Sequence, residues 1–140
     1  MTVLLVDAAN VVGSRPDGWW RDRSGANSRL LARLVALPQR VVAGPDGADL
    51  AVDAVVAVVE GRARHIEAPA GLRVVRAEGS GDDALADAAA ELAAAGIPAV
   101  VVTADRGLRA RLPAGVEVTG PGWLLAVLDQ IAGDEMTPPA

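Results

Sequence analysis

The sequence contains no cysteine, which excludes a disulfide framework, a thiolate metal site and a thiol nucleophile, and which suits a reducing interior. Tyrosine and phenylalanine are also absent, so the core must be aliphatic. No apolar run approaches the roughly 18 residues needed to span a bilayer. No basic leader precedes the first apolar run. We therefore expect a cytoplasmic protein with no membrane partner.

Lysine is missing as well, so all 13 residues counted as Lys or Arg are arginine, and the net charge is −5. A negative balance argues against wholesale coating of nucleic acid, because phosphate binding draws on a positive surface, although local basic patches are compatible with it. The 140 residues, 51% of them hydrophobic, can bury a sizeable core. We expect a single domain over residues 1–132, followed by a flexible tail over residues 133–140.

Short apolar runs alternate with helical patterns along the chain. The runs predict strands over residues 3–6, 52–59, 72–77, 99–103 and 116–119. Helices are predicted over residues 28–37, 80–95, 104–112 and 123–131, with a long loop over residues 11–25. Residues 41–50 are undecided between strand and turn. Because parallel neighbours need crossover connections, the alternation predicts an α/β fold: a three-layer parallel sheet of about five strands, with helices on both faces.

Acidic residues follow three of the predicted strands. Asp7 ends the first, Asp82 and Asp83 follow the third across a glycine-rich turn, and Asp105 comes two residues after the fourth. Because ligands of open parallel sheets bind outside the carboxyl ends of the strands, these carboxylates are expected to share one edge. Like charges so placed repel unless protons or cations neutralise them. Mg²⁺ or Mn²⁺, which prefers oxygen ligands, would relieve that repulsion.

Three segments carry a family resemblance: "LLVDAANVVG", "EGSGDDALAD" and "AVVVTADRGLRARL". Together they resemble the PIN-like nucleases, in particular the NYN branch that includes bacterial YacP-like proteins, and the resemblance covers residues 3 to 128. It implies metal-binding roles for Asp7, Asp83 and Asp105. Residues with further roles in this reading are Asn10 and Thr103 as supports, Asp82 as a fourth carboxylate, and Asp87 as an assisting residue one turn after Asp83.

Each acidic residue also has a structural interpretation. Asp82 and Asp83 are well placed to stabilise a helix N-terminus, and Asp105 has the position of an N-cap for the short helix after it. Asp7 is harder to explain in this way, since no helix is expected directly after it. The family pattern often has another acidic residue after the Asp105 position, whereas Arg106 stands here, which favours one metal over two.

Basic and aromatic residues are the candidates for substrate binding. In the long first loop, Trp19 and Trp20 are flanked by Arg15, Arg21 and Arg23, an arrangement able to stack on an unpaired base while binding phosphate. The alternative is that the tryptophans cover the sheet edge. The remaining candidates, which follow the second and fourth strands, are Arg62, Arg64 and Arg106.

These features together predict a Mg²⁺- or Mn²⁺-dependent ribonuclease that hydrolyses phosphodiester bonds. Asp7, Asn10, Asp83 and Asp105 are the predicted catalytic residues, and single-stranded RNA is the predicted partner. RNA is preferred over DNA only through the family resemblance. Two alternatives stay open: a non-catalytic RNA- or protein-binding module that keeps the fold, and a small nucleotide phosphatase. The oligomeric state, including a homo-oligomer, is not determined by the sequence.

Overall fold

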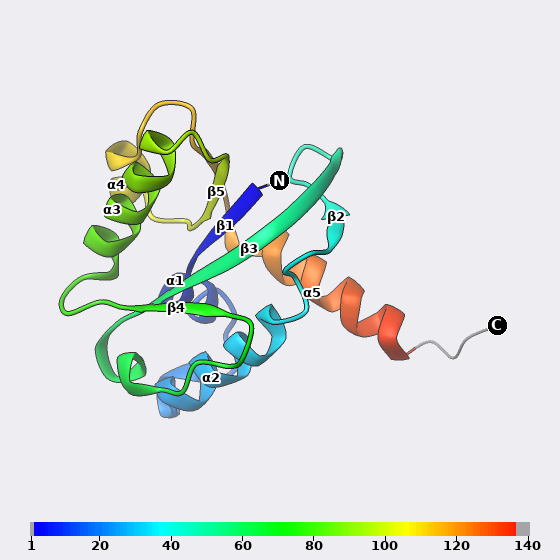
Figure 1. The fold of residues 1–140 in the computed structure, drawn as a ribbon. Helices are drawn as coiled ribbons and strands as arrows, with labels where there is room; N and C mark the ends of the chain where they lie inside the picture. The colour runs from blue at the N-terminus through cyan, green and yellow to red at the C-terminus, as the bar shows by residue number, and fades with distance from the viewer. Residues whose placement is uncertain (1, 137–140) are drawn as a thin grey trace.

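The structure, a computed structural model, describes residues 2–136, apart from the side chains of Arg62, Arg64 and Met136. Figure 1 shows a twisted central sheet with helices on both of its faces. The elements in chain order are β1 (Thr2–Asp7), α1 (Ala8–Val12), η1 (Trp19–Arg21), α2 (Arg23–Leu34), β2 (Val41–Ala43), β3 (Asp49–Val59), η2 (Gly61–His65), β4 (Arg73–Arg76), α3 (Gly81–Ala94), β5 (Ala99–Val102), α4 (Arg106–Arg111), β6 (Glu117–Thr119) and α5 (Pro121–Met136).

Strand β1 lies at the centre of the sheet, between β3 and β5, and pairs in parallel with both. Strand β6 extends the sheet beyond β5, and β4 pairs in parallel with the second half of β3. These five parallel strands confirm the predicted sheet. The short β2 adds a sixth, antiparallel strand beside the first half of β3, which resolves the undecided segment.

Two apolar cores, one on each face of the sheet, hold the helices in place. Alternate side chains of β1 point to opposite faces, so Leu4 and Val6 join one core while Val3 and Leu5 join the other. Helices α2 and α5 cover the first core with leucines, and α3 and α4 cover the second, chiefly with Leu85 and Leu108. Each fully buried leucine contributes about 1.5–3 kcal/mol. The predicted three layers are therefore present (Figure 1).

The segment after β1 differs from the prediction. Helix α1 begins at Ala8, directly after Asp7, so the expectation that no helix follows Asp7 was wrong. The expected loop over residues 11–25 contains the end of α1 and the turn η1, and α2 begins at Arg23 behind an Asp22 N-cap. These helical pieces are too short to show a clear apolar period, which is why the sequence pattern missed them.

The last helix is longer than its apolar pattern. It begins at Pro121, where Pro is favourable in a first turn, and extends to Met136. Residues 133–136, predicted as the start of a tail, are therefore helical, while residues 137–140 lie outside the described residues. Within residues 2–136, no helix is both long enough and apolar enough to cross a membrane.

Candidate metal and substrate site

Asp7 is the last residue of β1 and the N-cap of α1 at once. Its Oδ1 accepts a hydrogen bond of 3.3 Å from the backbone N–H of Asn10, which satisfies a free donor of the helix N-terminus. Its Oδ2 accepts a hydrogen bond of 3.0 Å from the hydroxyl of Thr103. Only 7% of Asp7 is exposed. A carboxylate at the end of this apolar strand is thus tolerated because both of its oxygens have donors.

Burial raises the pKa of the Asp7 carboxyl to about 6. The hydrogen bonds from Thr103 and Asn10 oppose this effect, and the negative charges of Glu60 and Asp82 add to it. Asp7 therefore has negatively charged neighbours, and its ionised form destabilises the folded protein. A positive ligand beside it would reverse that effect.

The loop between β5 and α4 is fixed against the start of α1. The hydroxyl of Thr103 accepts a hydrogen bond of 3.1 Å from the N–H of Asp105, and the Asn10 side-chain oxygen accepts one of 2.7 Å from the N–H of Ala104. Asp105 in turn caps α4, because its Oδ1 accepts a hydrogen bond of 3.0 Å from the N–H of Leu108. The structure therefore brings Asp7, Asn10, Thr103 and Asp105 together, as expected at the carboxyl ends of neighbouring strands.

Asp82 and Asp83, both in the first turn of α3, point to different neighbours. Burial raises the pKa of Asp82, the charges of Asp105, Glu60 and Asp83 raise it further, and the Arg111 guanidinium opposes them. Asp83 instead forms an ion pair of 2.7 Å with Arg111, and its side chain is 71% exposed. Asp82 is the α3 residue whose charge acts on Asp7, whereas Asp83 pairs with Arg111 of α4, and its role as a metal ligand stays a prediction.

The acidic group consists of Asp7, Asp82, Asp105 and Glu60. Glu60 was not among the residues predicted from the sequence. It follows β3 directly and is partly buried, and its side chain accepts a hydrogen bond from the N–H of Gly81 at the start of α3. The signal for it was available, because Glu60 stands at the carboxyl end of a predicted strand in the same way as Asp7. Asp87, by contrast, is exposed and lines a separate cavity of about 400 Å³ together with Arg73 and Glu91.

The chemistry of the acidic group suits a hard cation. Its side-chain donors are carboxylate oxygens, which Mg²⁺ and Mn²⁺ prefer. Among the described side chains, no three Asp, Glu or His residues are close enough together to hold one ion. A cation held by one or two carboxylates with waters completing its shell, as is common for Mg²⁺, fits this arrangement.

A cavity of about 440 Å³ opens beside Glu60, and Trp19 forms part of its wall. The Arg23 guanidinium lies 5.3 Å from the centre of the Trp19 ring, a distance typical of a cation–π contact. Trp20 packs edge-on against Trp19 at 6.0 Å between ring centres and is 52% exposed. Trp19 thus lines a cavity next to Glu60, whereas Trp20 lines a different cavity together with Arg21 and Asp22.

Asn27 lines the same cavity and was also missed. Its side-chain nitrogen donates to the carbonyl of Arg23 at 2.8 Å, while its buried Oδ1 has no hydrogen-bond partner among the described residues. The signal was a polar residue at the position that precedes Leu31 and Leu34 on the apolar face of α2. An amide in an otherwise apolar stripe is a candidate for ligand contact.

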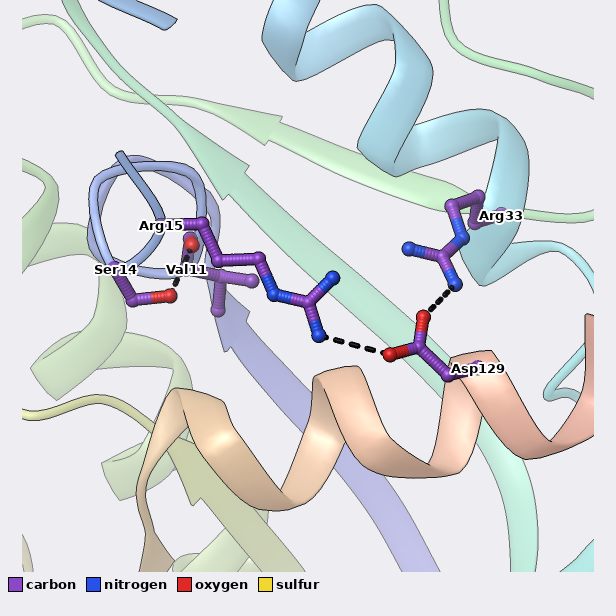
Figure 2. Close-up of polar contacts among 5 residues, drawn as sticks. All are labelled: Val11, Ser14, Arg15, Arg33 and Asp129. Carbon is purple, nitrogen blue, oxygen red and sulfur yellow. Dashed lines mark hydrogen bonds and ion pairs between the residues drawn. The ribbon is translucent and has the colours of Figure 1, made fainter. Parts of the chain in front are cut away.

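The predicted arginines are dispersed. Arg15 does not line the cavity of Trp19 and instead pairs with Asp129 of α5 (Figure 2). Arg106 is exposed in the first turn of α4, next to Asp105. Arg62 and Arg64 belong to η2, which follows Glu60, and their side chains lie outside the described residues.

Sheet order and helix placement define an α/β fold, a mostly parallel sheet with helices on both faces. A solved structure with this fold is that of a mutant of Rae1 (YacP) from Bacillus subtilis, to which this chain is similar with a TM-score of 0.68 and 18% sequence identity. The match covers 96% of this chain and 79% of that chain. The chain therefore has a YacP-like fold. No family model matches the sequence, and no curated protein matches it.

Proposed function

We propose that the chain is a divalent-metal-dependent ribonuclease that hydrolyses phosphodiester bonds. The observation that carries the proposal is the buried Asp7 carboxyl, whose pKa is raised to about 6 and which faces the charges of Glu60 and Asp82. Maintaining such a group of carboxylates without a positive ligand is unfavourable. Groups with perturbed pKa values of this kind gather at functional sites.

In the proposed site, Mg²⁺ or Mn²⁺ would be held by one or two of the carboxylates of Asp7, Asp82 and Asp105, with waters completing its shell and Glu60 beside it. Such an ion supplies an activated water and stabilises negative charge on phosphate oxygens. Thr103 fixes the direction of the Asp7 carboxylate through its hydrogen bond, and Asn10 holds the β5–α4 loop that carries Asp105. In this proposal Asp83 is not a metal ligand, and its role is to hold Arg111 through their ion pair.

The substrate is proposed to be single-stranded RNA. The cavity beside Glu60 offers the Trp19 ring for stacking and the Arg23 guanidinium for phosphate, a combination that suits an unpaired nucleotide. RNA is preferred over DNA because of the resemblance to PIN-like nucleases. Arg106 borders the acidic group and is a further candidate for contact with the strand.

Cleavage assays with Asp7→Asn test this proposal. Wild-type protein should cut single-stranded RNA in Mn²⁺ and not in EDTA, and Asp7→Asn should lose cleavage while remaining folded. Asp49→Asn is a matched control, because Asp49 is exposed at the opposite end of β3 from Glu60. An active Asp7→Asn variant would refute the role of Asp7. Hydrolysis of mononucleotides in the absence of RNA cleavage would instead identify a phosphatase.

A non-catalytic RNA- or protein-binding module is the second candidate. It is favoured by the separation of the acidic side chains, no three of which within the described part of the chain approach as closely as metal ligands do. Thermal unfolding with and without Mn²⁺ separates the two. Stabilisation by Mn²⁺ that disappears in Asp105→Ala supports the enzyme, and indifference to the metal supports the module.

A further inference from the structure

A second cavity, of about 220 Å³, lies between α1, α2 and α5 and is rich in arginine. Arg15, Arg29 and Arg33 line it together with one acidic residue, Asp17, so the lining is net positive. At about 30 Å³ for each water molecule, the space holds several waters or a phosphate group with fewer waters. Because the whole chain carries a charge of −5, this concentration of guanidinium groups stands out from the rest of the protein.

Asp129 of α5 reaches the arginines of this cavity with its carboxylate. Its Oδ2 accepts a hydrogen bond of 2.9 Å from Arg15, and its Oδ1 accepts one of 2.7 Å from Arg33 (Figure 2). Within residues 2–136, no acidic side chain whose placement is described forms an ion pair with Arg29. One carboxylate thus bridges two guanidinium groups, which is also the way in which two arginines hold a phosphate.

The contact with Asp129 is exchangeable. The side chains of Asp129, Arg15 and Arg33 are 50%, 46% and 36% exposed, and exposed ion pairs stabilise a protein by only about 0–1 kcal/mol. A phosphate brings more acceptor oxygens than a carboxylate, and the guanidinium fork matches them. It would therefore replace Asp129 at little cost and would also engage Arg29.

We propose that Arg15, Arg29 and Arg33 form a phosphate-binding site that Asp129 occupies in the free protein. This inference deepens the proposed function, on which the choice of an RNA strand as the source of the phosphate rests. Val11 and Val12 of α1 form part of the cavity wall, and Asp7 caps the opposite end of the same helix. At about 1.5 Å per residue, the segment from Asp7 to Val12 spans roughly 8 Å. A strand held at the arginines is thus close enough to continue to the acidic group.

Binding of a short fluorescein-labelled oligoadenylate in EDTA tests the proposal without any cleavage. Arg29→Ala and Arg33→Ala should each weaken binding about three- to tenfold, the effect of losing one hydrogen bond of ordinary strength. Each should also reduce the slope of log K against log salt by about 0.7. Asp129→Asn should tighten binding several-fold, because it removes the competing charge. A purely structural ion pair predicts no gain in affinity from Asp129→Asn.

Two controls match these variants. Arg73→Ala removes an exposed arginine from the amino end of β4. Asp134→Asn removes an exposed carboxylate five residues after Asp129 on α5, which bonds only to Gln130 among the described side chains. Both should bind like the wild type. Competition by inorganic phosphate, and comparison of oligomers with and without a 5′-phosphate, show whether a terminal or an internal phosphate enters the site; either result supports it.

The proposal is overturned if Arg29→Ala and Arg33→Ala bind like the wild type, if Asp129→Asn does not tighten binding, or if the wild type binds neither the oligomer nor phosphate. Failure of the proposed ribonuclease activity is distinguishable from these outcomes. If the protein does not cleave RNA but its binding of the oligomer weakens in the arginine variants, the proposed ribonuclease activity is refuted and the phosphate site is supported. If the protein cleaves RNA in Mn²⁺ but the arginine variants bind the oligomer like the wild type, the ribonuclease activity is supported and the phosphate site is refuted.

Discussion

The hydroxyl of Thr103 donates a hydrogen bond to the carboxylate of Asp7, 96 residues earlier in the chain, at 3.0 Å. The same oxygen accepts the N–H of Asp105 at 3.1 Å. Because β1 and β5 are parallel neighbours, one side chain can join the end of β1 to the loop that carries the second acidic residue. Thr103 therefore links Asp7 directly to the loop that carries Asp105, and the hydrogen bond between Ala104 and Asn10 holds the same loop.

Replacing Thr103 by valine should raise the pKa of Asp7 above about 6, because the hydrogen bond from Thr103 favours the ionised form. The variant should also lose about 1–3 kcal/mol of stability, since Thr103 is fully buried and valine leaves the N–H of Asp105 without its acceptor. NMR titration of the Asp7 carboxyl measures the pKa. Thr103→Ser keeps the hydroxyl and should restore the wild-type value; an unchanged pKa in Thr103→Val would contradict the bond.

Replacing Asp7 by asparagine should stabilise the metal-free protein near pH 7. The pKa of Asp7 is raised on folding from 3.8 to about 6, so the folded state binds more protons than the unfolded state between these values. Stability contributed by this group is therefore lost as the pH rises through that window, by about 3 kcal/mol in total. Asparagine does not ionise, so the Asp7→Asn variant does not lose this stability as the pH rises.

Urea unfolding in EDTA across a pH series measures this difference. The advantage of Asp7→Asn over the wild type should be largest above about pH 6 and should disappear below about pH 4. Asp49→Asn, at an exposed carboxylate on β3, should show no such pH dependence. A variant that is less stable than the wild type at pH 7 would mean that the Asp7 carboxylate is favourable as it stands.

Much of the fold could be predicted because local pattern and global fold agree. Branched apolar residues fill β1 and the second half of β3, which are buried on both faces, and Ser80 is the N-cap of the alanine-rich α3, as its capping pattern indicates. The carboxyl-end rule then placed Asp7 and Asp105 on one edge. Glu60 obeys the same rule, and it was overlooked because it opens a polar loop.

The orientation of neighbouring side chains could not be predicted. Asp82 and Asp83 are adjacent on α3, and successive helical residues point about 100° apart. Which of them faces Asp7 depends on how α3 packs against β1 and α4, through contacts such as those of Leu85. Helix α1 was hidden for a different reason: its five residues are too few to show a helical period.

Replacing Asp82 and Asp83 separately by asparagine should give different responses to Mn²⁺. Asp82→Asn should reduce the rise in Tm that Mn²⁺ produces, because Asp82 faces Asp105 and Glu60. Asp83→Asn should keep most of that rise and lose only the exposed pair with Arg111, worth about 0–1 kcal/mol. Thermal unfolding with Mn²⁺ and with EDTA measures both. Equal responses, or a larger loss in Asp83→Asn, would restore Asp83 as the ligand.

Replacing Gly81 by alanine should displace Glu60 while the fold survives. An added Cβ at Gly81 would lie 2.7 Å from a carboxylate oxygen of Glu60, a contact that the flexible end of that side chain relieves by moving away. Because the charge of Glu60 raises the pKa of Asp7, its displacement should lower that pKa below about 6 and weaken the response to Mn²⁺. Gly79→Ala is the matched control, since a Cβ there meets no atom within 4 Å and Gly79 does not have a positive φ. NMR titration of Asp7 in EDTA reads the effect without any metal; if the pKa of Asp7 is the same in Gly81→Ala as in Gly79→Ala, Glu60 is not part of the acidic group.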